Sequence, residues 1–145
     1  MAVSPALRRL LRVLELEEEQ RHRALEAAAG ELRRLQKAHA NAEEREHGGR
    51  AMVAAGARNG ILLDRLAGME ETRMARRAAA ALRERIKETE HAVAERRVEY
   101  LAKRVERRQA ETLIREAETR EAVEGERRGQ QRLDDWHLGW RQRRQ

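Results

Sequence analysis

Apolar residues recur along the first third of the chain with the spacing of a coiled-coil seam. Alternating steps of four and three residues from Leu7 to Ala42 meet leucine or alanine at eight of eleven positions. A repeat of 3.5 residues is typical of helices that pack in a left-handed coiled coil. Three polar residues interrupt the stripe, namely Glu18, Arg21 and His39.

The residues around this stripe predict where the first helix begins and ends. Ser4 followed by Pro5 suits a helix start, because proline at the first helical position loses no hydrogen bond. Glycines interrupt the charged periodicity from Gly48 onward, and Asn59-Gly60 is a turn signal. We therefore expect a first helix over residues 5–47 and a connector over 48–60 that forms the tip of a hairpin.

A second helical pattern begins at Ile61 and continues to the C-terminus without a proline. We expect this second helix to span residues 61–140, with weak points at Gly125 and Gly129. Two registers stay open, because two sets of large apolar residues compete for the buried face. One set follows a 3.5-residue repeat and comprises Leu82, Ile86, Val93, Tyr100 and Ile114; the other lies off that stripe and comprises Val98, Leu101 and Val105.

Composition supports long helices and excludes most other folds. The 145 residues are 40% charged and only 2% aromatic, which leaves too little bulky apolar surface to cover a sheet. Alanine, glutamate, lysine, leucine and arginine make up about two thirds of the chain, above the roughly half that indicates long helices. Disorder is the rival interpretation, but single proline and serine residues argue against it.

These patterns predict an all-α fold of one domain, residues 1–145, in which two long helices form an antiparallel coiled-coil hairpin with unequal arms. A first helix that ends at residue 47 would cover the second helix only to about residue 104. The C-terminal part of the second helix should then project beyond the hairpin. A projecting amphipathic helix usually has an intermolecular partner.

No residue pattern indicates catalysis, a cofactor or a metal site. The five histidines are scattered, cysteine is absent, and the glycines of 48–60 lack the order of a phosphate-binding loop. The many arginines raise nucleic acid as a partner, but glutamates interleave with them along both helices. No apolar run is long enough to span a membrane. We expect a cytoplasmic protein that is not an enzyme, binds no nucleic acid and does not insert into a membrane.

The C-terminal end carries the most distinctive side chains. Leu133, Trp136 and Trp140 fall on one helical face, and the residues from Arg127 onward hold four of the six net positive charges. Tryptophan and arginine are enriched at the energetic centres of interfaces. This segment is therefore a candidate binding surface, although the tryptophans could instead fold back on their own hairpin.

The chain opens with a leucine-rich turn that leads into an acidic cluster, residues 6–18. The second helix begins with Leu62-Leu63-Asp64-Arg65-Leu66, and Gln131-Arg132-Leu133-Asp134-Asp135 lies near the C-terminal end. In this order, the three motifs resemble the opening, the apolar entry motif and the near-terminal signature of the flagellar FliJ family and its injectisome counterparts, the YscO family. The resemblance covers nearly the whole chain.

The resemblance implies a non-catalytic central stalk of a flagellar or type III protein-export apparatus. Such a protein would bind and promote the hexameric export ATPase and couple it to the export-gate protein, at the cytoplasmic face of the inner membrane. Some family members also handle export chaperones. By this analogy, the ATPase contact would use Arg127, Arg128, Leu133, Trp136 and Trp140.

The same analogy places the export-gate contact at the head of the second helix, on Leu62, Leu66, Met69 and Arg73. These residues follow 4, 3, 4 spacing on one helical face. The alternative is that this stripe packs the hairpin itself, and the spacing favours that alternative. For the whole chain, the rival hypothesis is a generic coiled-coil scaffold that dimerises through the second helix and would sediment at twice the monomer mass.

Overall fold

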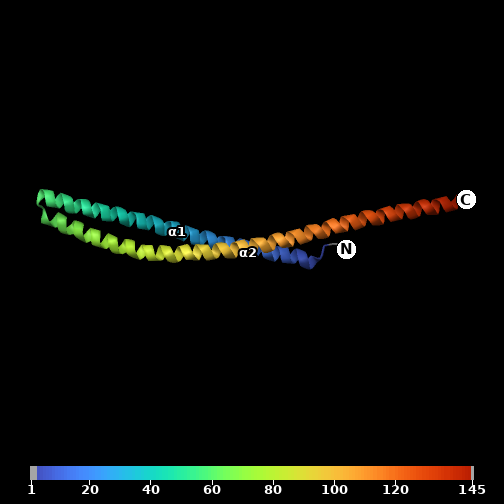
Figure 1. Ribbon diagram of the computed structural model, residues 1–145, viewed down its shortest axis with the longest axis horizontal. Helices are drawn as coiled ribbons and strands as arrows, with labels where there is room; N and C mark the ends of the chain where they lie inside the picture. Colours follow the sequence, from blue (N-terminus) through green and yellow to red (C-terminus); the bar gives the residue numbers. More distant parts are fainter. Residues whose placement is uncertain (1–2, 145) are drawn as a thin grey trace. The chain divides into compact units, whose positions relative to one another are not determined.

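A computed structural model describes residues 3–144, which form two long helices joined by a short turn (Figure 1). Helix α1 spans Pro5–Asn59 and helix α2 spans Leu62–Arg143. The helices pack as an antiparallel hairpin, as predicted. The chain divides into two compact units, which we call the tip unit, residues 21–100, and the terminal unit, the described residues of 1–20 and 101–145.

The turn between the helices is much shorter than the predicted connector of 48–60. Helix α1 continues through Gly48, Gly49 and Gly56 to Asn59, so the prediction that it ends at residue 47 is wrong. The chain reverses at Gly60, whose φ of +73° lies in the left-handed region that glycine adopts without strain. The Asn59 side-chain oxygen accepts a hydrogen bond of 3.0 Å from the Ile61 amide.

Glycine is needed inside the helices of the tip unit because their backbones approach closely. A methyl group on Gly68 would lie 2.7 Å from the Gly49 carbonyl oxygen and 2.8 Å from the Val53 amide nitrogen. A methyl group on Gly56 would meet the Arg65 amide nitrogen at 2.8 Å. Gly49 and Gly56, two of the glycines that suggested a connector in the sequence, are therefore packing residues. Contact with α2 offsets the roughly 1 kcal/mol that a helical glycine costs.

Small residues dominate the buried face of the tip unit. Ala75 and Ala79 of α2 are almost fully buried, as are Leu35 and Ala42 of the α1 stripe. In the alanine-rich segment 78–81, Ala79 is buried and Ala78 partly buried, whereas Ala80 and Ala81 are exposed. Such a seam buries little apolar area for each residue, and much of its stability must come from its length.

The structure selects one of the two registers that the sequence left open for α2. Ile86, Val93 and Ile114, from the 3.5-residue repeat, lie partly buried. Val98 and Val105, from the competing set, are 68% and 54% exposed. The repeat therefore forms the inner face of α2.

Charged residues replace apolar ones in part of the seam of the terminal unit. Glu17 forms an ion pair of 2.8 Å with Lys103. Glu18 forms an ion pair with Arg107, and Arg107 forms a second ion pair, of 2.7 Å, with Glu111. The hydrogen bonds to Glu18 and then to Glu111 raise the pKa of Arg107. These pairs explain how the polar interruption of the stripe at Glu18 is tolerated.

We expect Arg107→Leu to lower the free energy of unfolding by about 1 kcal/mol, because it leaves the mostly buried Glu18 carboxylate without this partner. Adding Glu18→Leu should restore at least that amount, since two leucines can pack in the seam. Urea unfolding followed by circular dichroism measures both effects. Lys87→Leu, which removes an exposed ion pair with Glu84, serves as the control. A double variant no more stable than Arg107→Leu would contradict this account.

Helix α2 continues past the start of α1 in the terminal unit. Arg8, close to the start of α1, pairs with Glu118 at 4.0 Å, so α1 accompanies α2 well beyond residue 104, the limit expected from the sequence. The difference arises because α1 is longer and the turn shorter than predicted. Most of residues 119–143 lie beyond the first turn of α1, and the helix stays continuous through Gly125 and Gly129.

Candidate partner-binding surfaces

The last turns of α2 present an aromatic and basic surface, which we call the C-terminal surface and define by Arg127, Arg128, Leu133, Trp136 and Trp140. Leu133 and Trp136 are more than half exposed, and Trp140 is 42% exposed. The helix places Leu133, Trp136 and Trp140 on one face, because they follow steps of three and four residues.

The two indole rings stack on each other along the helix. Their centroids lie 6.5 Å apart with an interplanar angle of 16°, and the Arg144 guanidinium carbon lies 4.0 Å from the Trp140 ring centroid. In the described part of the terminal unit, the tryptophans thus remain on the helix instead of folding back. Sequence reasoning counted Arg144 among the arginines from Arg127 onward but missed its contact with Trp140, which the spacing of four residues could have indicated.

The predicted gate-contact stripe lies at the head of α2 in the tip unit, and three of its members are apolar and exposed. Leu62, Leu66 and Met69 are 64%, 53% and 57% exposed. This exposure speaks against the favoured alternative, that the stripe packs the hairpin, because more than half of each side chain is accessible to solvent. Packing uses the neighbouring face instead, where Gly68 and Ala75 are buried. The fourth member, Arg73, forms an ion pair of 2.8 Å with Glu70.

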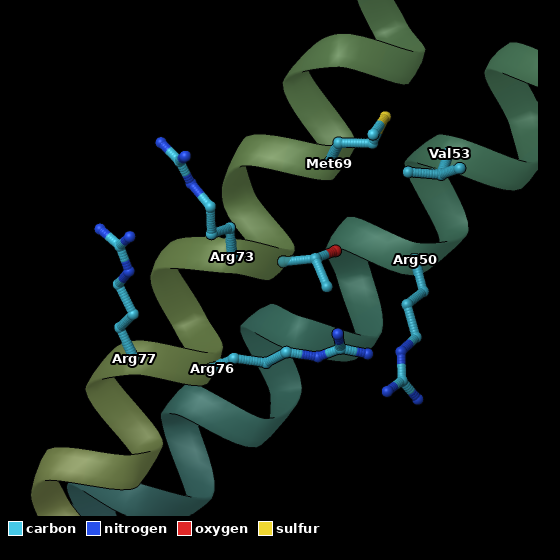
Figure 2. A pocket seen from close by; sticks show the side chains of 7 residues that line it. Arg50, Val53, Met69, Arg73, Arg76 and Arg77 are labelled. Atoms are coloured by element: carbon cyan, nitrogen blue, oxygen red, sulfur yellow. The ribbon is translucent and has the colours of Figure 1, made fainter.

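A groove of about 500 Å³ lies between α1 and α2 beside this stripe, and we call it the tip groove (Figure 2). Val53 of α1 and Met69 of α2 point toward each other across it. The groove is lined by Arg50, Val53, Met69, Thr72, Arg73, Arg76 and Arg77. Sequence reasoning missed Arg50 and Val53 because it assigned residues 48–60 to a connector, which gave no reason to align them with α2.

Four arginines surround the tip groove, and a single glutamate bridges two of them. Glu46 accepts hydrogen bonds of 2.9 Å from Arg76 and 2.6 Å from Arg50. The hydrogen bond from Arg76 lowers the pKa of Glu46, so this carboxylate stays ionised at neutral pH. Arg77 forms no ion pair with any residue that the structure describes. The groove therefore keeps an excess of positive charge.

Residues 3–144 contain no group of three or more histidine, aspartate or glutamate side chains that could hold a metal ion. In the same part of the chain, neither helix has an apolar stretch long enough to cross a membrane.

The fold and its exposed surfaces define a class: a two-helix coiled-coil protein with candidate partner surfaces on α2. The chain belongs to the FliJ family, because the model of the flagellar FliJ protein matches residues 3–144. Family membership makes it a component of the flagellar protein-export apparatus. Comparison with curated proteins finds no match, and comparison with solved structures finds none either.

Proposed function

We propose that this protein is the non-catalytic central stalk of the flagellar export apparatus. It binds the hexameric export ATPase, promotes its assembly or activity, and couples it to the export-gate protein. The observation that carries this proposal is the C-terminal surface. It exposes two tryptophans and several arginines on the part of α2 that continues beyond the start of α1. Family membership supplies the export context.

The chemistry of the C-terminal surface suits an anchor inside a protein ring. Exposed tryptophans offer large apolar contact area at low entropic cost, and arginines add charged hydrogen bonds to carboxylates. The other exposed side chains of the terminal unit are mostly charged or small, with some large apolar residues such as Leu101 and Leu113 among them. Such a surface makes weak, exchangeable contacts, so a few anchors would hold the stalk while the rest of it remains free to move against the ring.

The exposed stripe of Leu62, Leu66 and Met69 supports the gate contact. Three large apolar side chains on one exposed face of helix α2 form the kind of patch that marks protein interaction sites. Arg73 adds a charge at the end of the stripe. In this proposal the protein works in the cytoplasm, peripherally at the cytoplasmic face of the inner membrane, needs no cofactor, and offers a surface to export chaperones.

The first test is the steady-state ATP hydrolysis rate of the export ATPase from the same organism, measured with and without this protein. The oligomeric state of the ATPase is followed in parallel by analytical ultracentrifugation. We expect a rate increase that rises together with ring formation. Absence of binding and of any rate change at micromolar concentrations would favour a generic coiled-coil scaffold instead.

We expect Leu62→Ser with Leu66→Ser to weaken binding of the gate protein's cytoplasmic portion about tenfold, because two exposed apolar contacts are lost. The same double variant should change the free energy of unfolding by no more than about 0.5 kcal/mol per site relative to the wild type, since both side chains are more than half exposed. Calorimetric titration and urea unfolding measure the two effects. Leu10→Ser with Val13→Ser, two similarly exposed apolar residues in the terminal unit, is the matched control.

Unchanged gate binding by the Leu62 and Leu66 variant would remove this stripe from the proposal. A large loss of stability would show that the stripe packs the hairpin after all.

A further inference from the structure

The tip groove gathers four arginine side chains around an apolar centre. Carboxylates shared by two arginines also occur elsewhere in the tip unit, as at Glu99, which pairs with Arg21 and Arg96 at 3.2 Å each. At the groove, Arg50 and Arg76 share Glu46. Arg73 pairs with Glu70, and Arg77 forms no ion pair with a described residue, so four guanidinium groups stand against two carboxylates at the groove.

The apolar part of the groove lies next to these cations. Met69 is 57% exposed, and Val53 on the opposite helix is partly buried. Figure 2 shows Arg73 and Arg77 on the same side of α2, whereas Arg76 reaches toward α1. A ligand that placed an apolar side chain between Val53 and Met69 would therefore bring its flanking groups close to guanidinium groups.

We propose that the tip groove binds an acidic protein segment that carries a large apolar side chain between carboxylates. This inference rests on the proposed gate contact, because the groove shares Met69 and Arg73 with that stripe, and it specifies the chemistry of the partner. Guanidinium groups pair with carboxylates through two parallel hydrogen bonds, which gives direction as well as charge complementarity. The apolar side chain supplies the desolvated anchor.

Nucleic acid fits the groove less well than an acidic protein segment. Binding of single strands relies on aromatic side chains on which bases stack, and none of the seven residues that line the groove is aromatic. The carboxylates of Glu46 and Glu70 lie beside the arginines and would repel a continuous phosphate backbone. A short protein segment can place its own carboxylates to avoid them.

The test measures binding of the gate protein's cytoplasmic portion to the full chain by fluorescence anisotropy at several salt concentrations. Arg73→Gln with Arg77→Gln should weaken binding about fivefold and reduce its salt dependence, because two charge contacts are lost. Met69→Ala should weaken binding by a similar factor without changing the salt dependence. The matched controls are Arg33→Gln with Lys37→Gln, a charge pair of equal spacing outside the groove, and Met74→Ala, which removes a methionine that is 50% exposed.

Overlapping peptides from the same gate portion identify the segment that binds, and a fluorescent single-stranded oligonucleotide serves as a competitor. The inference requires that the binding peptide carry a net negative charge. It also requires that the peptide lose affinity when its acidic residues are replaced by glutamine. It is overturned if the Arg73 and Arg77 variant binds like wild type, or if the oligonucleotide displaces the peptide at equal charge concentration. Loss of gate binding in the Leu62 and Leu66 variant but not in the arginine variant would leave the gate contact standing and remove only this inference.

Discussion

Replacing Gly68 with leucine is expected to destabilise the tip unit by about 3 kcal/mol, at the upper end of overpacking costs. Even a methyl group at this position would lie 2.7 Å from the Gly49 carbonyl oxygen and 2.8 Å from the Val53 amide. Both atoms belong to the backbone of α1, so relief requires the helices to separate. Urea unfolding monitored by circular dichroism measures the change in free energy.

Gly48→Leu is the matched control for this prediction. Gly48 lies in the same helix as Gly49, but no atom outside its own helix backbone lies within 4 Å of a methyl group placed there. Leucine at this position should therefore stabilise the protein by roughly 0.8 kcal/mol, the difference in helix propensity. If the two leucine variants changed stability in the same direction, the close approach of the helices would be refuted.

Trp136→Ala combined with Trp140→Ala is expected to weaken association with the export ATPase at least tenfold. The two rings are exposed and stacked, and truncating a tryptophan at an interface centre commonly costs about 2 kcal/mol or more. Sedimentation or surface plasmon resonance with the assembled ATPase measures the affinity. Stimulation of ATP hydrolysis should fall in parallel.

The control for the tryptophan variant is Leu101→Ala with Val105→Ala. These residues lie on α2 in the same unit and are 43% and 54% exposed, so the substitution also removes exposed apolar area. Helicity should be unchanged in both double variants, because alanine favours the helix. An ATPase affinity that drops equally in both variants would show that general apolar surface, and not the C-terminal surface, makes the contact.

Much of the fold was predictable because coiled coils are local structures. The stripe from Leu7 to Ala42 and the repeat through Ile86 and Val93 were read from spacing alone, and both form the inner faces of the helices. In a two-helix hairpin, each buried position is decided mainly by its place in the repeat. The C-terminal surface was also accessible from the sequence, because Leu133, Trp136 and Trp140 share a face of any helix that contains them.

The end of α1 could not be predicted from local sequence, because of the glycines near the tip. Gly49 and Gly56 lower helix propensity, and sequence reasoning therefore ended α1 at residue 47. The same feature, the missing side chain, allows α1 and α2 to come into backbone contact. The lower helix propensity of glycine depends only on α1, whereas the packing that glycine permits depends on α2. The sequence of α1 alone therefore does not show which of the two effects is larger.

The sequence by itself determined that the protein is two long helices in an antiparallel hairpin, and it supplied the motifs of the FliJ family. Periodicity, helix propensity and the scarcity of turn residues suffice for this, because all three act within a few residues along the chain. Only the tertiary structure decided where α1 ends, which faces are exposed at the head of α2, and that Arg50 and Val53 line a groove with Met69. These features depend on the alignment of residues distant in sequence, which is set by the turn at Gly60 and by the contact between Gly49 and Gly68.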